Sequence, residues 1–410
     1  MEIGLFTEFE WRAGVDEAQA FDDSLTQTTV AEDLGYDAVW LAELHFQKER
    51  SVLSSPLVVG ATIAGRTKRV KIGFAVQVLP LIHPLRLAED VATLDQVSKG
   101  RVDFGVGRSG LPEHYTGFSI PYDESQQRFD ETLEILLKAW TEERFTYEGK
   151  YFQFHDVCAI PKPYQKPHPP LWVACSNIAT IGSAGQWGMG ALGFQFVTPE
   201  AARAWVTEYY LSLTGRLAKL ADYPANPNIA MVTAFMCAPT DALAQEKAAG
   251  WTFFVFCLSH YGRHGMAAPG KSNMWELYQE WRHTPKAQET LRVGLIGSPE
   301  TIRRKLREFE ATNVDQVILL NQTGRTSHED ICASLELFAR EVMPEFHARE
   351  PEHQRWKADV LAGRLRLEAL DTSAHTVYAH QNEDIVRLTP DELKRKMAAK
   401  EAARAAGGSD

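Results

Sequence analysis

The chain has 410 residues, of which 44% are hydrophobic and 24% charged, and it carries a formal net charge of −11. This is the composition of a globular protein that is long enough for a large core. An acidic chain without a run of basic residues lacks the electrostatic footprint of proteins that bind nucleic acids or anionic membranes. The N-terminal segment MEIGLFTEFEW has no signal-peptide pattern, and no apolar run reaches membrane-spanning length. We therefore expect a soluble, cytoplasmic protein with no nucleic-acid partner and no membrane partner.

Short apolar runs alternate along the chain with stretches of helical period. The runs that read as strands cover residues 3–9, 38–43, 70–79, 102–107, 171–176, 190–197, 228–237 and 314–321. Helical patterns cover 16–34, 55–65, the stretch after His83-Pro84, 123–142 and 328–342, and Ser298-Pro299 predicts another helix start. Eight strands, mostly followed by helices, predict parallel βαβ units and an α/β fold, namely a (β/α)8 TIM barrel.

Two insertions and a tail interrupt this pattern. Residues 144–157 predict a β-hairpin, and residues 250–297 form a long excursion between the seventh and eighth strands. The charged segment after residue 345 predicts a helical extension, with a helix start at Thr389-Pro390-Asp391-Glu392. The domain organisation is thus predicted as a barrel over 1–345 and a C-terminal extension over 346–410.

Two motifs indicate an anion site. The stretch GVGRSG (105–110) has the glycine spacing of a dinucleotide-binding loop, but a loop and no second acidic strand follow it, so we reject that interpretation. Small residues there still let a ligand approach the backbone, and Arg108 is a natural phosphate ligand. In WVACSNIAT (172–180) the hydroxyls and free N–H groups at a helix start suit an anion, although an ordinary Ser cap explains the same pattern.

Polar residues follow several predicted strands at the end where a barrel carries its active site. Glu43 and His45 end the second strand, and His83 follows the third. His260 and His264 are four residues apart, but Gly262 and Gly265 argue against a helix, so we predict no metal site. The five cysteines show no C-x-x-C spacing and favour buried thiols in a reducing compartment.

Several of these stretches together resemble the bacterial luciferase-like, flavin-dependent monooxygenases, in particular the luciferase α subunit. They are GYDAVWLAELHF (35–46), residues 75–108, PPLWVACSNIAT (169–180), and the C-terminal segments GSPETIRRKL, VDQVILL and SLELFAREVMPEF within residues 297–346. The resemblance implies a TIM barrel that binds reduced FMN at the C-terminal face. It implies a non-prolyl cis peptide at Ala75-Val76 and flavin contacts there and at Gln77. It implies phosphate contacts at Arg108, Ser176, Thr180 and the backbone of Cys175.

The same resemblance implies the reaction. Family members add oxygen at C4a of the reduced flavin and shelter the peroxyflavin from water in an apolar cavity under a loop that closes over it. We expect residues 250–297 as the lid, and a cavity lined by Phe6, Phe74, Phe194 and Phe196.

The chain departs from the luciferase pattern at two positions. Leu44 replaces the histidine that acts as the general acid/base in luciferase, and Gly107 replaces its reactive cysteine. Since leucine cannot move a proton, emission of light from an aldehyde by the same arrangement is not expected. His45 and Glu43 are then the predicted catalytic residues.

The expected activity is that of a two-component monooxygenase that oxygenates a small, apolar organic substrate with O2. Reduced FMN would come from a separate NAD(P)H-flavin reductase, because the chain has no dinucleotide-binding unit of its own. Two alternatives stay open: a deazaflavin-dependent hydride-transfer enzyme on the same fold, and a non-catalytic flavin-binding relative. The family habit of pairing through helices implies a homodimer.

Overall fold

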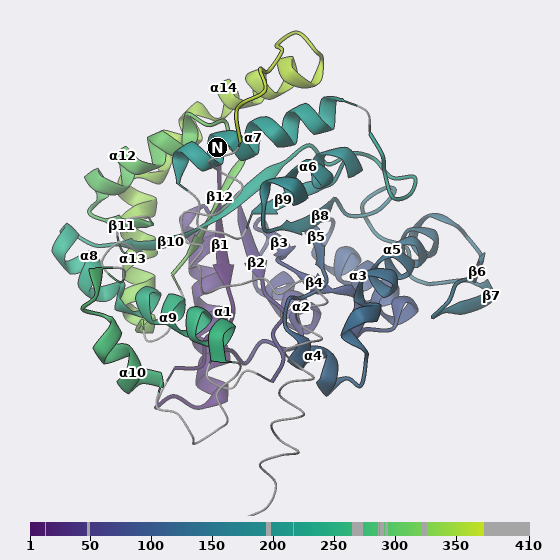
Figure 1. Ribbon diagram of the computed structural model, residues 1–410, viewed down its shortest axis with the longest axis horizontal. Coiled ribbons are helices and arrows are strands. Elements are labelled where there is room, and N and C mark those ends of the chain that lie inside the picture. Colours follow the sequence, from purple (N-terminus) through teal and green to yellow (C-terminus); the bar gives the residue numbers. More distant parts are fainter. Residues whose placement is uncertain are drawn as a thin grey trace, which may run out of the picture.

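Eight parallel strands close into a barrel surrounded by helices (Figure 1). The computed structural model describes residues 1–12, 14–46, 50–193, 198–215, 217–264, 274–285, 287, 291, 294–321 and 326–372. The barrel strands pair in chain order, and β12 pairs with β1 to close the ring. They are β1 (Glu2–Thr7), β2 (Ala38–Leu41), β3 (Lys71–Phe74), β5 (Val102–Gly107), β8 (Leu171–Cys175), β9 (Gly190–Gly193), β10 (Ile229–Cys237) and β12 (Gln316–Leu320). The predicted (β/α)8 fold is confirmed.

Most of the surrounding helices begin where the sequence predicts them. They are α1 (Glu17–Leu34), α2 (Pro56–Arg66), α3 (Pro84–Ser98), α5 (Ser125–Thr141), α6 (Ile178–Trp187), α7 (Pro199–Thr214), α12 (Pro299–Glu310) and α13 (His328–Glu341). Proline occupies the first turn of α2, α3, α7 and α12, where its missing N–H costs nothing. Ser298 caps α12 as predicted, because its side chain accepts a hydrogen bond from the Thr301 N–H.

The predicted strand 70–79 is interrupted. The peptide bond between Ala75 and Val76 is cis, as the resemblance implies, and it separates β3 from the short strand β4 (Gln77–Val78). A 3-10 helix, η1 (Leu79–Leu81), leads from β4 toward α3. The predicted strand 190–197 ends at Gly193 in β9, and its last four residues lie outside the described chain, together with the predicted cavity residues Phe194 and Phe196.

Two indoles fill the barrel interior. The rings of Trp40 and Trp172 meet edge to face with centroids 5.2 Å apart, and Trp40 Nε1 donates to Gln316 Oε1 at 2.6 Å. Glycine is required opposite Trp40, because a Cβ on Gly73 would lie 2.3 Å from that ring. Phe6 joins this inner cluster, as expected for a cavity-lining residue. Phe74 does not: it packs outward against Phe104, since both faces of a buried parallel strand are apolar and the sequence does not distinguish them.

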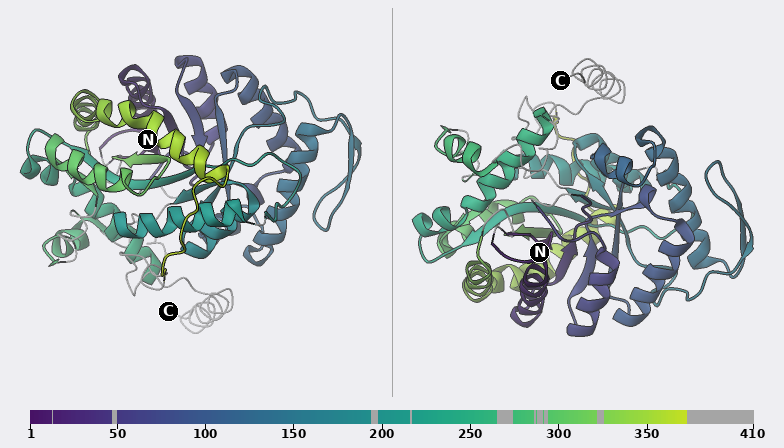
Figure 2. Two further views of the ribbon diagram at one scale, coloured as in Figure 1. Left: turned by 90° about the horizontal axis from the view of Figure 1, so that it is seen from above. Right: turned by 90° about the horizontal axis from the view of Figure 1, so that it is seen from below.

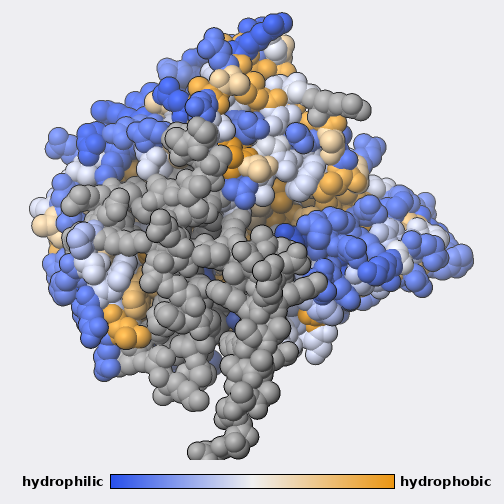
Figure 3. All heavy atoms as spheres, viewed as in Figure 1, coloured by the Kyte–Doolittle hydropathy of each residue, from blue (hydrophilic) through white to orange (hydrophobic). Residues whose placement is uncertain are grey.

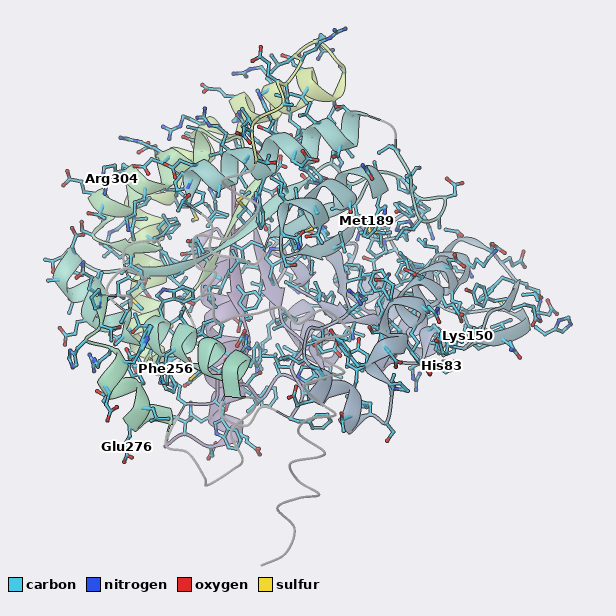
Figure 4. All side chains as sticks on the ribbon, in the orientation of Figure 1. His83, Lys150, Met189, Phe256, Glu276 and Arg304 are labelled. Atoms are coloured by element: carbon cyan, nitrogen blue, oxygen red, sulfur yellow. The ribbon has the colours of Figure 1, made fainter. Side chains whose placement is uncertain are left out.

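The predicted hairpin is present as β6 (Phe145–Glu148) and β7 (Gln153–Val157), an antiparallel pair. The hairpin projects from the side of the barrel (Figure 2), and the surface of the hairpin that is visible in Figure 3 is mainly hydrophilic. His83 packs beneath it, with ring centroids 5.8 and 5.7 Å from Phe152 and Phe154, and lies near Lys150 in Figure 4. His83 thus lies in the loop that ends at the start of α3, where the His83-Pro84 pair predicts a helix start, and its ring packs on the hairpin.

The excursion between β10 and β12 is mainly helical. It contains α8 (Asp241–Lys247), α9 (Ala249–His264), α10 (Met274–Trp281) and β11 (Leu295–Gly297), which extends β10 by a parallel pairing. The glycine argument against a helix at 260–264 is wrong, because α9 continues through Gly262 to His264. Residues 265–273 and the side chains of His260 and His264 lie outside the described structure. Phe256 on α9 packs on Tyr278 and Trp281 of α10 (Figure 4).

One face of α9 covers the C-terminal end of the barrel. Trp251 and Phe254 are buried in the same cluster as Phe6, Trp40 and Leu320. In Figure 1, α9, α10 and the short helix α4 (Pro112–Gly117) lie toward one end of the barrel, and α14 (Met343–Leu361) lies at the other. The sequence predicted a loop where α4 begins. No helix in the described part of the chain is long and apolar enough to cross a membrane.

Helix α14 fastens the chain to the N-terminal end of the barrel. Asp315, which precedes β12, is buried and accepts hydrogen bonds from Tyr210 Oη at 2.8 Å and from the Ile229 N–H at 2.7 Å. From α14, His353 Nε2 and Lys357 Nζ approach the same carboxylate to 2.8 and 3.0 Å. The predicted domain boundary at 345/346 falls inside α14, whose Phe346 and Val360 belong to the outer core. The predicted helix start at 389–392 lies outside the described residues.

Candidate functional site

Glu43 and His45 follow β2 and form the centre of a buried polar cluster. Each is less than a tenth exposed, and His45 Nε2 lies 2.8 Å from Glu43 Oε1. The second carboxylate oxygen of Glu43 accepts hydrogen bonds from the side-chain amide of Gln77 and, at 2.8 Å, from the Val78 N–H. Burial raises the pKa of Glu43, although the bonds from His45 and Val78 oppose the shift. This carboxyl ties the end of β2 to β4, directly after the cis peptide.

His114 on α4 completes the cluster from another part of the chain. Its Nε2 accepts the backbone N–H of His45 at 3.4 Å, and its Nδ1 lies 3.4 Å from Ser109 Oγ. Burial lowers the pKa of His114 to about 4, with smaller contributions from the neighbouring His45 ring and the Arg50 guanidinium, so the His114 imidazole is neutral at pH 7. The ring of Phe118 meets His45 edge to face at 4.9 Å. No sequence pattern marks this pairing, because His114 and His45 are 69 residues apart.

Arg50 joins the cluster to α9. Its Nε donates to Glu8 Oε2 at 2.6 Å, and its guanidinium lies 4.8 Å from the centroid of the Phe254 ring. Glu8 follows β1, so this ion pair connects the ends of two adjacent strands with the helix that covers them. Arg50 is therefore neutralised by Glu8, and a cation–π contact holds it beneath α9.

The cis peptide at Ala75-Val76 lies against two glycines of β5, Gly105 and Gly107. A Cβ on Gly105 would lie 1.9 Å from the Phe74 carbonyl oxygen, and a Cβ on Gly107 would lie 2.4 Å from Val76 Cγ2. Gly105 and Gly107 of GVGRSG therefore serve the close approach of β5 to the end of β3, which agrees with our rejection of a dinucleotide-binding loop. Gly107 also leaves no thiol at the position of the reactive cysteine in luciferase.

Arg108 extends from the end of β5 and is exposed. Its Nη1 lies 3.3 Å from Ser125 Oγ at the start of α5, and the Tyr115 hydroxyl donates to its carbonyl oxygen. The backbone of Arg108 is thus fixed by α4 while its guanidinium faces the solvent, an arrangement suited to an anionic group.

The segment Cys175-Ser176-Asn177 joins β8 to α6. The helix cap is Asn177 rather than Ser176: Asn177 Oδ1 accepts the Thr180 N–H at 2.8 Å, and Thr180 Oγ1 accepts the N–H groups of Ser176 and Asn177 at 3.0 Å. Thr180 is thus engaged in a capping box, whereas the Ser176 hydroxyl is not its cap. Cys175 is buried, and burial raises the pKa of its thiol to about 12. Its side chain is inert, and only its backbone remains suited to a ligand.

These features fit FMN. The unpaired buried Oε1 of Gln77 next to the cis peptide suits a ring N–H, and Gly105 and Gly107 place no side chain of β5 against the peptide. Arg108 and the N-terminus of α6 offer positive charge for a phosphate. The described residues contain no group of three or more His, Cys, Asp or Glu that could hold a metal ion.

The site residues that the sequence did not reveal are His114, Phe118, Arg50 and Glu8. Each lies on a loop or short helix, and its partner is distant in the sequence or belongs to another strand end. A pattern of alternating apolar residues carries no information about such contacts.

The fold is a (β/α)8 barrel with a buried polar cluster at the C-terminal ends of its strands. The profile of the luciferase-like monooxygenases matches residues 1–316, so the chain belongs to this family. It is 26% identical over 355 residues to the oxygenase component of a flavin-dependent trigonelline monooxygenase from Acinetobacter baylyi, a match that covers 84% of this chain and 96% of that protein.

Other relatives match over shorter segments. The uncharacterized protein y4wF of Sinorhizobium fredii is 36% identical over 45% of this chain and 57% of its own length. The alkanal monooxygenase alpha chain of Photorhabdus laumondii is 34% identical over 39% of this chain and 44% of its own. The chain thus spans about half the length of these relatives.

Solved structures show the same fold. Monooxygenase RslO1 from Streptomyces bottropensis superposes with a TM-score of 0.69 at 26% identity, covering 84% of this chain and all of that one (100%). The oxygenating constituent of 3,6-diketocamphane monooxygenase from Pseudomonas putida, in complex with FMN, gives 0.67 at 23% identity over 84% and 98% of the two chains. An F420-dependent secondary alcohol dehydrogenase gives 0.63 at 18% identity over 83% and 98%, which is a likeness of fold alone.

Proposed function

We propose that this protein is the oxygenase component of a two-component monooxygenase that uses reduced FMN and O2 to oxygenate a small, largely apolar organic substrate. Bound reduced FMN supplies two electrons, so that one oxygen atom of O2 enters the substrate and the other leaves as water. A separate NAD(P)H-flavin reductase supplies the reduced flavin. Family membership and the similarity to an oxygenase component support this proposal.

The observation that carries the proposal is the unpaired, buried Oε1 of Gln77 beside Gly105 and Gly107 of β5, where Glu43 holds the Gln77 amide. Ala75, Val76 and Gln77 contact the flavin ring. Arg108, Ser176 and the backbone at Cys175 bind its phosphate, while Thr180 fixes the backbone of the loop. Trp251 and Phe254 of α9 exclude water from that end of the barrel.

His45 is the group placed to hold or move a proton, because Leu44 cannot. Glu43 positions the His45 ring from one side. His114 accepts the His45 backbone N–H from the other side and stays neutral at pH 7. We also propose that the protein is a homodimer.

The test is anaerobic titration with reduced FMN and with reduced F420, followed by admission of O2. We expect reduced FMN to bind and to be reoxidised with little release of hydrogen peroxide when substrate is present. Tight binding of F420 without FMN binding would favour the deazaflavin-dependent enzyme, and FMN binding without reaction would favour the non-catalytic relative.

The phosphate role of Arg108 has its own test. Replacing Arg108 with Ala should weaken binding of reduced FMN by about 10- to 100-fold, the value of a charge-assisted contact, and leave riboflavin binding unchanged. Arg86→Ala is the matched control, because Arg86 is an exposed arginine on α3 that forms ion pairs with Glu89 and Asp90 of its own helix. Equal losses of FMN and riboflavin binding would rule out the phosphate contact.

A further inference from the structure

Unpaired polar side chains gather at the C-terminal end of the barrel. Among the described residues, both carboxylate oxygens of Glu10 and both amide atoms of Asn321 are buried without a hydrogen-bond partner, as is Oε1 of Gln77. Buried polar groups in native proteins are nearly always paired, and those that are not call for a physical cause. Gln77 belongs to the proposed flavin site. Glu10 and Asn321 have no role in it.

Glu10 lies on the segment that follows β1, and its residue is 8% exposed. Its backbone forms an antiparallel bridge with Ser51, beside Arg50. The two nearby cations are already engaged, because Arg50 binds Glu8 and the Arg12 guanidinium donates to Asp23. Burial raises the pKa of Glu10 well above its ordinary value; the charge of Arg12 opposes this shift, and the neighbouring Glu8 carboxylate adds to it. Glu10 is therefore a buried acid whose two carboxylate oxygens have no hydrogen-bonded partner among the described residues.

Asn321 follows β12, the strand that pairs with β1. Strands β1 and β12 are adjacent, and Phe6 is in register with Leu320, so Asn321 directly follows the last paired residue of β12. The residue is 1% exposed. Phe6 and Leu320 belong to the apolar cluster of the barrel interior. The ends of β1 and β12 are thus adjacent. Their last paired residues, Phe6 and Leu320, are apolar, and the segments that follow carry the unpaired side chains of Glu10 and Asn321.

We propose that Glu10 and Asn321 form a polar subsite that binds a protonated amine, so that the substrate is an amine with an apolar body. The ammonium group supplies the hydrogen-bonded partner that the Glu10 carboxylate lacks and donates to Asn321 Oδ1 as a second acceptor. The apolar body packs on the Phe6 and Leu320 side. A carboxylate in the same place would face Glu10 and Glu8, so the subsite discriminates by charge. This inference rests on the proposed monooxygenase function and specifies its substrate class.

The test uses the full chain and three probes that share a phenyl ring: 2-phenylethylamine, its neutral isostere 2-phenylethanol, and 3-phenylpropionate. We expect the amine to bind the wild-type protein at least about tenfold more tightly than the other two, as a charge-assisted hydrogen bond provides. In Glu10→Gln this preference should vanish while binding of 2-phenylethanol is unchanged. Equal affinity of the wild type for all three probes, or an equal loss for all three in Glu10→Gln, would overturn the subsite.

Thermal unfolding of the same samples separates a binding role from a structural one. Glu10→Gln should keep or raise the melting temperature, because it removes an acid buried without a partner. The matched control Glu8→Gln should lower it, because Arg50 then loses its partner. A fall in Glu10→Gln as large as in Glu8→Gln would overturn the proposal. Binding of reduced FMN, measured in parallel, tests the proposed monooxygenase function itself. If the protein binds FMN but does not prefer the amine, the amine subsite is refuted and the proposed monooxygenase function is not.

Discussion

Replacing Glu43 tests whether this carboxylate organises the end of β2 and the cis peptide beside it. In Glu43→Ala, the Val78 N–H and the Gln77 amide both lose their acceptor in a buried place. Each stranded donor costs about 1–3 kcal/mol, so the free energy of unfolding should fall by about 2–6 kcal/mol. His45 also loses its partner at Oε1.

Glu43→Gln should be much milder. The glutamine can direct its oxygen to the Val78 N–H and the Gln77 amide and turn its own amide group toward His45 Nε2, so all three contacts can form. We expect a loss of about 1 kcal/mol or less. Urea unfolding curves of the wild type and both variants give these differences, and titration with reduced FMN shows whether the flavin site survives. Equal costs for the two variants, or no cost for Glu43→Ala, would refute the proposed bonding.

Three further variants test other parts of the structure. Gly105→Ala should destabilise the protein and abolish FMN binding, because its Cβ would lie 1.9 Å from the Phe74 carbonyl oxygen; Gly110→Ala, with no atom within 4 Å, is the control, and both are read by thermal unfolding. Asp315→Asn should cost about 3–5 kcal/mol at pH 7 by stranding Lys357. Burial opposes ionisation of Asp315, but His353 and Lys357 outweigh it and lower its pKa below the ordinary 3.8, so this cost should shrink as the pH falls below 3.8. His114→Phe should remove the acceptor of the His45 N–H and shift the pH profile of turnover, whereas an unchanged profile would exclude a role for His114.

The fold was largely predictable because its signals are local. Proline in the first turn of α2, α3 and α12 and the Ser298 cap mark helix starts, and the eight apolar runs mark the strands. Local signals do not show which face of a buried strand points inward, so Phe74 was assigned to the wrong side. Packing can also outweigh the low helix propensity of a single glycine. Helix α9 continues through Gly262 because its apolar face is buried against the barrel and α10.

The site was predictable only where its residues lie on strand ends. Glu43 and His45 are two residues apart, and their contact at 2.8 Å follows from that spacing together with the bend after β2. The position of His83 was set by the rings of the inserted hairpin, and that of His114 by a six-residue helix which the sequence does not mark. The roles of the flavin-contacting residues came from the family resemblance and remain predictions.

The closure of the barrel by β12 also constrains how the chain folds. Glu2 Oε2 accepts a hydrogen bond from Gln316 Nε2, a contact between residues 314 positions apart. During synthesis the open edge of β1 must wait for almost the whole barrel sequence before its partner emerges, and such long-range pairings form slowly. An unpaired parallel edge is a template for aggregation. We expect chains truncated before residue 316 to aggregate rather than to form a smaller stable barrel, and expression of the protein to depend on factors that protect this edge.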